Sequence, residues 1–79
     1  MNTDSYLISP ACFSRALGHL VGLGTLSAHE AVRYRHGLVP NSFKLPLPHG
    51  GWLEHSPAGY VIRGVRGPSF QADRAWVLG

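Results

Sequence analysis

The apolar residues of this chain change their spacing near its middle. Between Ser9 and Gly37 they recur every three or four positions, which is the period of a helix with one buried face. From Phe43 onward they alternate with polar residues and prolines, which is the period of a strand. We therefore expect an α+β fold in which two N-terminal helices pack on a small antiparallel sheet of three to four short strands.

The first helix is expected over residues 10–22. Ser9 can accept a hydrogen bond from a free backbone amide, and Pro10 is well tolerated at the first helical position. A stripe of apolar side chains follows at helical spacing, and glycines end the helix. The stripe is formed by Phe13, Ala16, Leu17, Leu20 and Val21, and the glycines are Gly22 and Gly24.

The second helix is expected over residues 28–36, within the stretch SAHEAVRYRHG. Ser27 and Glu30 have the spacing of a capping box, in which each side chain binds the backbone amide of the other residue. Gly37 can adopt the left-handed conformation that closes a helix. The cations of the last turns are favoured by the helix dipole, and they are Arg33, Arg35 and His36.

Short strands are expected in the second half of the chain, over residues 43–47, 52–55, 60–66 and 75–78. Pro46 and Pro48 lack the amide that a central strand needs, so residues 43–47 should form an edge strand. The turn sequence SPAG should join the next two strands in a hairpin. Residues 6–8 could also join the sheet. Most aromatic side chains should fill the small core, including Phe13, Phe43 and Trp52.

The length and composition indicate one domain over residues 1–79. The chain is 44% hydrophobic, which is too apolar for a disordered chain. A single cysteine, Cys12, excludes a disulfide within one chain and favours a reducing compartment. We find no signal-peptide pattern and no apolar run long enough for a membrane span, so a cytoplasmic protein without membrane contact is expected.

The HEAVR stretch does not fit a zinc site. Arg33 stands where the H-E-x-x-H pattern needs its second ligand, and arginine does not ordinarily bind metal. His29 and His36 lie two helical turns apart, which is too far to share one ion. No metal and no cofactor are therefore expected.

Catalytic motifs are also missing from the sequence. No serine lies in a G-x-S-x-G elbow, the glycines do not have phosphate-loop spacing, and no two of the four acidic residues are close in sequence. We expect no enzymatic activity.

Basic and aromatic side chains suggest a contact surface instead. The net charge is +3, which suits either nucleic acid or an acidic protein face. On a helix His29, Arg33 and His36 share one face, and Tyr34 beside them should be partly exposed. Tyrosine and arginine are typical of interface hot spots. The candidate partner-binding residues are His29, Arg33, Tyr34, His36, Arg63 and Arg66.

In size and composition the chain is similar to small accessory proteins of phages and mobile elements, among them the anti-CRISPR proteins. That likeness implies a protein that blocks a host complex, one that handles nucleic acid, by steric occlusion. Two helices followed by a basic hairpin also resemble a winged helix-turn-helix in outline, so a small DNA-binding regulator is the alternative. Both a monomer and a homodimer remain open.

Overall fold

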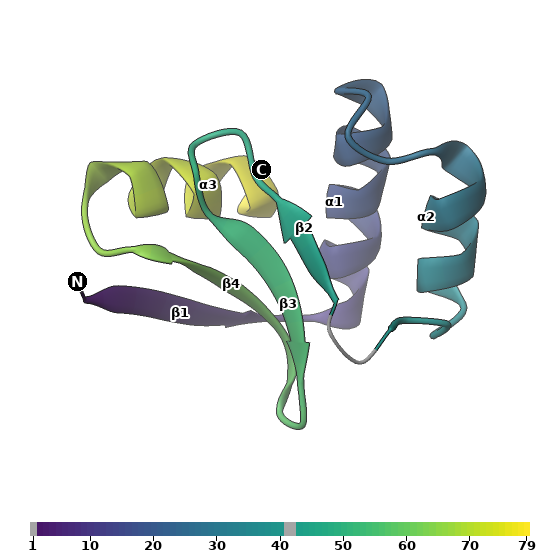
Figure 1. Cartoon of the computed structure of the whole chain (residues 1–79), viewed down its shortest axis with the longest axis horizontal. Coiled ribbons are helices and arrows are strands. Elements are labelled where there is room, and N and C mark those ends of the chain that lie inside the picture. Colours follow the sequence, from purple (N-terminus) through teal and green to yellow (C-terminus); the bar gives the residue numbers. More distant parts are fainter. Residues whose placement is uncertain (1, 41–42) are drawn as a thin grey trace.

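The computed structural model describes residues 2–40 and 43–79 and has an α+β fold (Figure 1). One helical pair follows the first strand, three strands come next, and a third helix ends the chain. The elements in chain order are β1 (Thr3–Ile8), α1 (Pro10–Gly22), α2 (Ala28–Arg35), β2 (Lys44–Pro46), β3 (Trp52–Ser56), β4 (Gly59–Val65) and α3 (Pro68–Leu78).

The two predicted N-terminal helices are confirmed, together with their caps. Ser9 Oγ accepts a hydrogen bond from the amide of Cys12 at 3.1 Å. Ser27 Oγ accepts from the amide of Glu30 at 3.1 Å, and the amide of Ser27 donates to Glu30 Oε1 at 3.4 Å, which completes the capping box. Gly37 has φ 83°, the left-handed conformation that its position predicted.

The four strands form one antiparallel sheet in the order β1-β4-β3-β2. β3 and β4 form the predicted hairpin, with Leu53 opposite Ile62. β2 is the predicted edge strand, and residues 6–8 do join the sheet as part of β1. One face of the sheet packs against helices, and its core side chains include Leu45, Leu53 and Ile62.

The predicted strand at residues 75–78 is wrong, because these residues form the end of α3. Gly67 turns the chain out of β4 with φ 139°, and Pro68 begins the helix. The buried residues of α3 are Phe70, Asp73 and Val77, whose spacings of three and four are helical. The apolar run of four residues at 75–78 was too short to outweigh this longer period.

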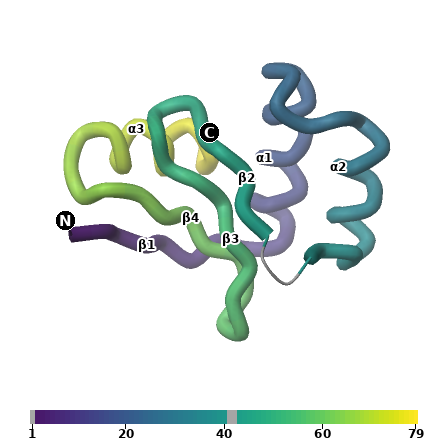
Figure 2. The backbone as a smooth tube through the Cα atoms, viewed as in Figure 1, coloured from purple at the N-terminus to yellow at the C-terminus, as the bar shows by residue number. Residues whose placement is uncertain are grey.

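The packing of the helices also differs from the expectation of two N-terminal helices on the sheet. α3 packs against β4, α1 packs against both α3 and α2, and α2 lies at one end of the molecule (Figures 1 and 2). α1 reaches the sheet through Phe13, whose ring stacks on that of Tyr60 with centroids 3.7 Å apart. Of the helices described, none is long and apolar enough to cross a membrane.

Candidate binding surfaces

The second face of the sheet, which we call the open face, lies opposite the side that the helices contact. Tyr60 contacts Phe13 of α1, and Gly64 and Gly51 face Phe70 and Asp73 of α3. These three strand residues therefore mark the core side of the sheet. Successive residues of a strand point to opposite faces, so the alternate residues of each strand belong to the open face. They are Thr3, Ser5 and Leu7 of β1, Val61, Arg63 and Val65 of β4, Trp52, Glu54 and Ser56 of β3, and Lys44 and Pro46 of β2.

Four side chains from three strands are linked across this face. The Lys44 ammonium lies 4.6 Å from the centroid of the Trp52 ring. Trp52 Nε1 donates to Glu54 Oε1 at 3.1 Å, and Arg63 Nε donates to Glu54 Oε2 at 2.6 Å. Strand register explains the cluster, because Lys44 pairs with Glu54 and Trp52 pairs with Arg63. We call these four residues the open-face cluster.

Glu54 is the centre of the open-face cluster. The hydrogen bond from Trp52 lowers the pKa of the Glu54 carboxyl, and the hydrogen bond and charge of Arg63 lower it further, while partial burial acts in the opposite direction. Glu54 therefore stays ionised at neutral pH and holds the indole and the guanidinium in one arrangement.

Apolar side chains flank Arg63 on the same face. Val65 lies two residues along β4 and is 48% exposed, and Leu7 on β1 is 56% exposed. The solvated face of an antiparallel sheet is usually polar. Exposed apolar groups beside a tryptophan and two cations therefore give this face the composition of an interface.

On α2, three of the residues predicted to bind a partner lie together. His29 and Arg33 of α2 and His36, which caps the C-terminus of this helix, are all exposed, and helical spacing places them on its outer face together with Val32. Tyr34 lies on the inner side, where its ring packs edge-on against Phe43 with centroids 5.0 Å apart. Tyr34 therefore contributes mainly to packing between α2 and the segment before β2.

Arg63 and Arg66 do not join this helical face. α2 lies at one end of the long axis, and the turn between β4 and α3 that contains Arg66 lies at the other end (Figure 1). Arg63 belongs to the open-face cluster, and Arg66 pairs with Asp4 at 3.1 Å. The structure thus divides the predicted surface into two separate surfaces.

The charges of the chain are unevenly satisfied. Each of its four carboxylates has a partner within the chain: Asp4 with Arg66, Glu30 with Ser27, Glu54 with Arg63, and Asp73 with His49. Of the seven Lys and Arg side chains, two pair with carboxylates, which leaves five without such a pair in residues 2–40 and 43–79. The unbalanced surface charge is therefore positive.

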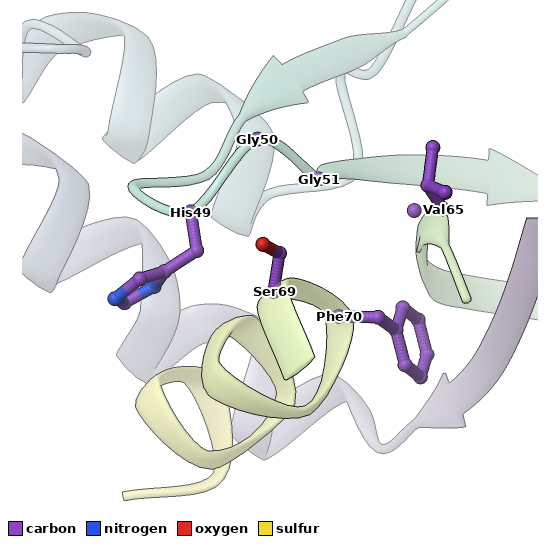
Figure 3. Close-up of a pocket in the computed structure, with 7 residues that line it drawn as sticks. His49, Gly50, Gly51, Val65, Ser69 and Phe70 are labelled. Carbon is purple, nitrogen blue, oxygen red and sulfur yellow. The ribbon is translucent and has the colours of Figure 1, made fainter. Parts of the chain in front are cut away.

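Sequence reasoning missed a pocket of about 190 Å³ between the β2–β3 turn and the start of α3 (Figure 3). Asp73, fully buried, accepts hydrogen bonds from the amides of His49 (2.8 Å) and Gly51 (2.7 Å). Its Oδ1 also lies 3.1 Å from His49 Nδ1, and the His49 side chain is 45% exposed. The helical spacing of Asp73 from Phe70 and Val77 was the signal that could have revealed this buried carboxylate beside the pocket.

The pocket does not assemble a nucleophile. Ser69 lines it, but the His49 ring points away from the Ser69 hydroxyl (Figure 3). The His49 ring contacts Asp73 instead, with Nδ1 lying 3.1 Å from Oδ1. Within the described ranges, no three His, Cys, Asp or Glu side chains are placed to hold a metal ion. The three hydrogen bonds of Asp73 connect the β2–β3 turn to α3.

Comparison with known proteins adds no relative: no family model, no curated protein and no solved structure matches this chain.

Trp52 is the aromatic residue whose position in the structure differs from the prediction that it fills the core. Phe13 and Phe43 are core residues as expected. Trp52 is only partly buried, and its register places it on the open face. The alternation of β3 could have shown this, because Leu53 must then point to the core.

Proposed function

We propose that this chain is a non-enzymatic binding protein that covers an acidic surface of a partner protein with the open face of its sheet. It would act by steric occlusion. The observation that carries this proposal is the open-face cluster, in which Glu54 fixes Trp52 and Arg63 while Lys44 covers the indole.

The preorganisation of the open-face cluster supports binding. Tryptophan and arginine are the residue types that most often dominate binding free energy at interfaces. Immobilising a flexible side chain on binding costs about 0.5–1.5 kcal/mol, and a side chain that is already held avoids much of that cost. Arg63 and Trp52 are held on a strand scaffold before any partner arrives.

Charge and apolar surface together define the partner's chemistry. Lys44 has no carboxylate pair in the described part of the chain, and the unbalanced surface charge is positive, so the complementary surface is acidic. Leu7 and Val65 require apolar groups near those acids. A protein surface offers both, whereas a phosphate backbone offers only the charge.

If the partner is a host complex that handles nucleic acid, only the acidic parts of that complex's surface suit this chain. Its nucleic-acid channel is basic, because it must bind phosphates. A basic inhibitor would therefore dock on an acidic surface outside that channel. There it would block a contact between two subunits of the complex or a conformational change of the complex.

Charge reversal at two separated sites tests the proposal. Lys44→Glu changes the open face and Arg33→Glu makes a matched change on α2, and each variant is the control for the other. Immobilised wild type and variants would be incubated with nuclease-treated lysate of the encoding organism. We expect a captured protein that Lys44→Glu loses by at least about tenfold and Arg33→Glu retains.

Lys44→Arg should keep that capture, because it preserves the cation over the indole. Circular dichroism would show that each variant is folded. Capture that survives Lys44→Glu, or that Arg33→Glu abolishes, would contradict docking by the open face.

A second candidate function, DNA binding, rests on the outer face of α2. His29, Arg33 and His36 share that exposed face, and Arg33 has no carboxylate pair in the described residues. A helix of this kind can contact phosphates or enter a major groove. Wild type should then bind duplex DNA with a steep salt dependence, and Arg33→Gln should reduce the salt slope by about one. Binding that ignores salt would exclude this candidate.

A further inference from the structure

The two edges of the sheet differ in their protection. The edge at β2 has three residues and contains Pro46, which cannot donate to another strand. The edge at β1 has six residues without proline. β1 contacts β4 on one side, and no described element covers its other side (Figure 1). Long uncovered edges of this kind readily pair with another strand.

The backbone register shows which groups β1 presents at its outer edge. The amide of Arg66 donates to the carbonyl of Asn2 at 3.0 Å, so Asn2 and Arg66 form a hydrogen-bonded pair. In an antiparallel ladder hydrogen-bonded pairs alternate with non-hydrogen-bonded pairs. Asp4, Tyr6 and Ile8 therefore bond inward to β4. Thr3, Ser5 and Leu7 direct their amides and carbonyls outward.

We propose that β1 pairs antiparallel with β1 of a second copy of this chain. The product is a homodimer with one continuous eight-stranded sheet. The outward groups fix the register. Ser5 lies opposite Ser5 of the second copy, and Thr3 of each copy lies opposite Leu7 of the other, which makes three pairs. Each of these three pairs exchanges two hydrogen bonds, which satisfies all the outward groups of Thr3, Ser5 and Leu7.

Side chains are complementary in this register. Asp4 lies opposite Tyr6 of the second copy and not opposite Asp4, so like charges do not meet. The Arg74 guanidinium lies 5.1 Å from the centroid of the Tyr6 ring, so the same pairing brings Asp4 of the second copy toward a cation. Tyr6 and Leu7, 38% and 56% exposed, both lose exposed surface.

The symmetry has a consequence for the shape of the dimer. A twofold axis through the Ser5 pair stands perpendicular to the sheet, so both open faces lie on the same side of it. The dimer therefore presents two open-face clusters in one direction. A single strand edge is smaller than the roughly 1,200–2,000 Å² of a standard interface, so we expect dimerisation to be weak and to depend on concentration.

Sedimentation velocity of the purified chain tests this pairing between about 10 μM and 1 mM, the range of weak dissociation constants. The wild type should shift from the 8.6 kDa monomer toward twice that mass. Ser5→Pro removes an outward amide while leaving the β1–β4 ladder intact, and should weaken dimerisation at least tenfold. Ser5→Ala, which keeps the amide, should dimerise as the wild type does.

Hydrogen exchange of the wild type gives a readout that needs no variant. The amides of Thr3, Ser5 and Leu7 should become protected as the concentration rises, while the exposed amide of Ala58 in the β3–β4 turn should not. A monomer at about 1 mM, or exchange at these three amides that does not change with concentration, would overturn the proposal. So would a dimer that Ser5→Pro leaves intact. Both assays use the chain alone, so their result is independent of whether the open face binds a partner.

Discussion

The carboxylate of Asp73 accepts a hydrogen bond from the backbone amide of Gly51 at 2.7 Å, and this contact joins α3 to the start of β3. The same carboxylate accepts from the amide of His49 at 2.8 Å. Asp73 is fully buried, and so is its bond to the Gly51 amide, whereas the bond to the His49 amide is partly buried. The position of the C-terminal helix on the sheet thus depends on one acidic side chain and on a glycine that lets it approach.

Removing this carboxylate should destabilise the chain strongly. Asp73→Ala leaves the buried amide of Gly51 and the partly buried amide of His49 without their acceptor. An unsatisfied buried donor costs about 1–3 kcal/mol, and a partly buried one costs less. We expect a loss of roughly 3 kcal/mol in the free energy of unfolding, measured by urea denaturation. Asp4→Asn is the matched control, because it removes a partly exposed ion pair worth about 0.2–1 kcal/mol. Equal losses in the two variants would contradict the role given to Asp73.

The absence of a side chain at Gly51 should matter as much as the carboxylate. A Cβ atom there would lie 2.6 Å from Asp73 Oδ2 and 2.7 Å from the carbonyl oxygen of Arg63. The first atom is held by buried hydrogen bonding and the second belongs to the backbone, so neither can move aside easily. Gly51→Ala should therefore lower the thermal unfolding midpoint, at a cost of roughly 1–3 kcal/mol for overpacking. Gly22→Ala should be neutral or slightly stabilising, because no atom lies within 4 Å of a Cβ at the end of α1. A tolerated Gly51→Ala would show that α3 can shift.

Local signals explain why the N-terminal helices were predictable. Ser9-Pro10, the Ser27–Glu30 box and Gly37 each act within a few residues of the helix end that they define. The end of α2 could be predicted without knowing the rest of the fold. These two helices therefore carry their own boundaries in the sequence.

α3 and the open-face cluster lack such local signals. Gly67 provides no side-chain cap, and one of the three buried positions of α3 is Asp73, which reads as exposed in a hydrophobicity pattern. Its burial makes sense only once the amides of the β2–β3 turn are in place. The cluster depends in the same way on the register of three strands, which brings Lys44 opposite Glu54 and Trp52 opposite Arg63.

Arg15 on α1 should stabilise the last turn of α3. Its Nη2 donates to the carbonyl of Leu78 at 2.6 Å and to that of Val77 at 3.4 Å, where a helix leaves its carbonyls unpaired. Arg15→Gln should cost about 1 kcal/mol and speed hydrogen exchange at the end of α3. Arg33→Gln, on the outer face of α2, should change neither quantity. Unaltered exchange in Arg15→Gln would show that α3 holds its end without this bond.

Glu54 should make part of the stability depend on acid pH. Hydrogen bonding from Trp52, followed by Arg63, lowers its pKa in the folded chain below the ordinary value of 4.5, so the unfolded chain binds more protons. The contribution is fully present above that value and is lost as the pH falls through the lower folded pKa. Urea unfolding followed by circular dichroism should show that Glu54→Gln loses less stability than wild type between about pH 6 and 3, by roughly 0.2–1 kcal/mol. Trp52→Phe removes the main cause and should fall between them, whereas parallel curves for wild type and Glu54→Gln would contradict the linkage.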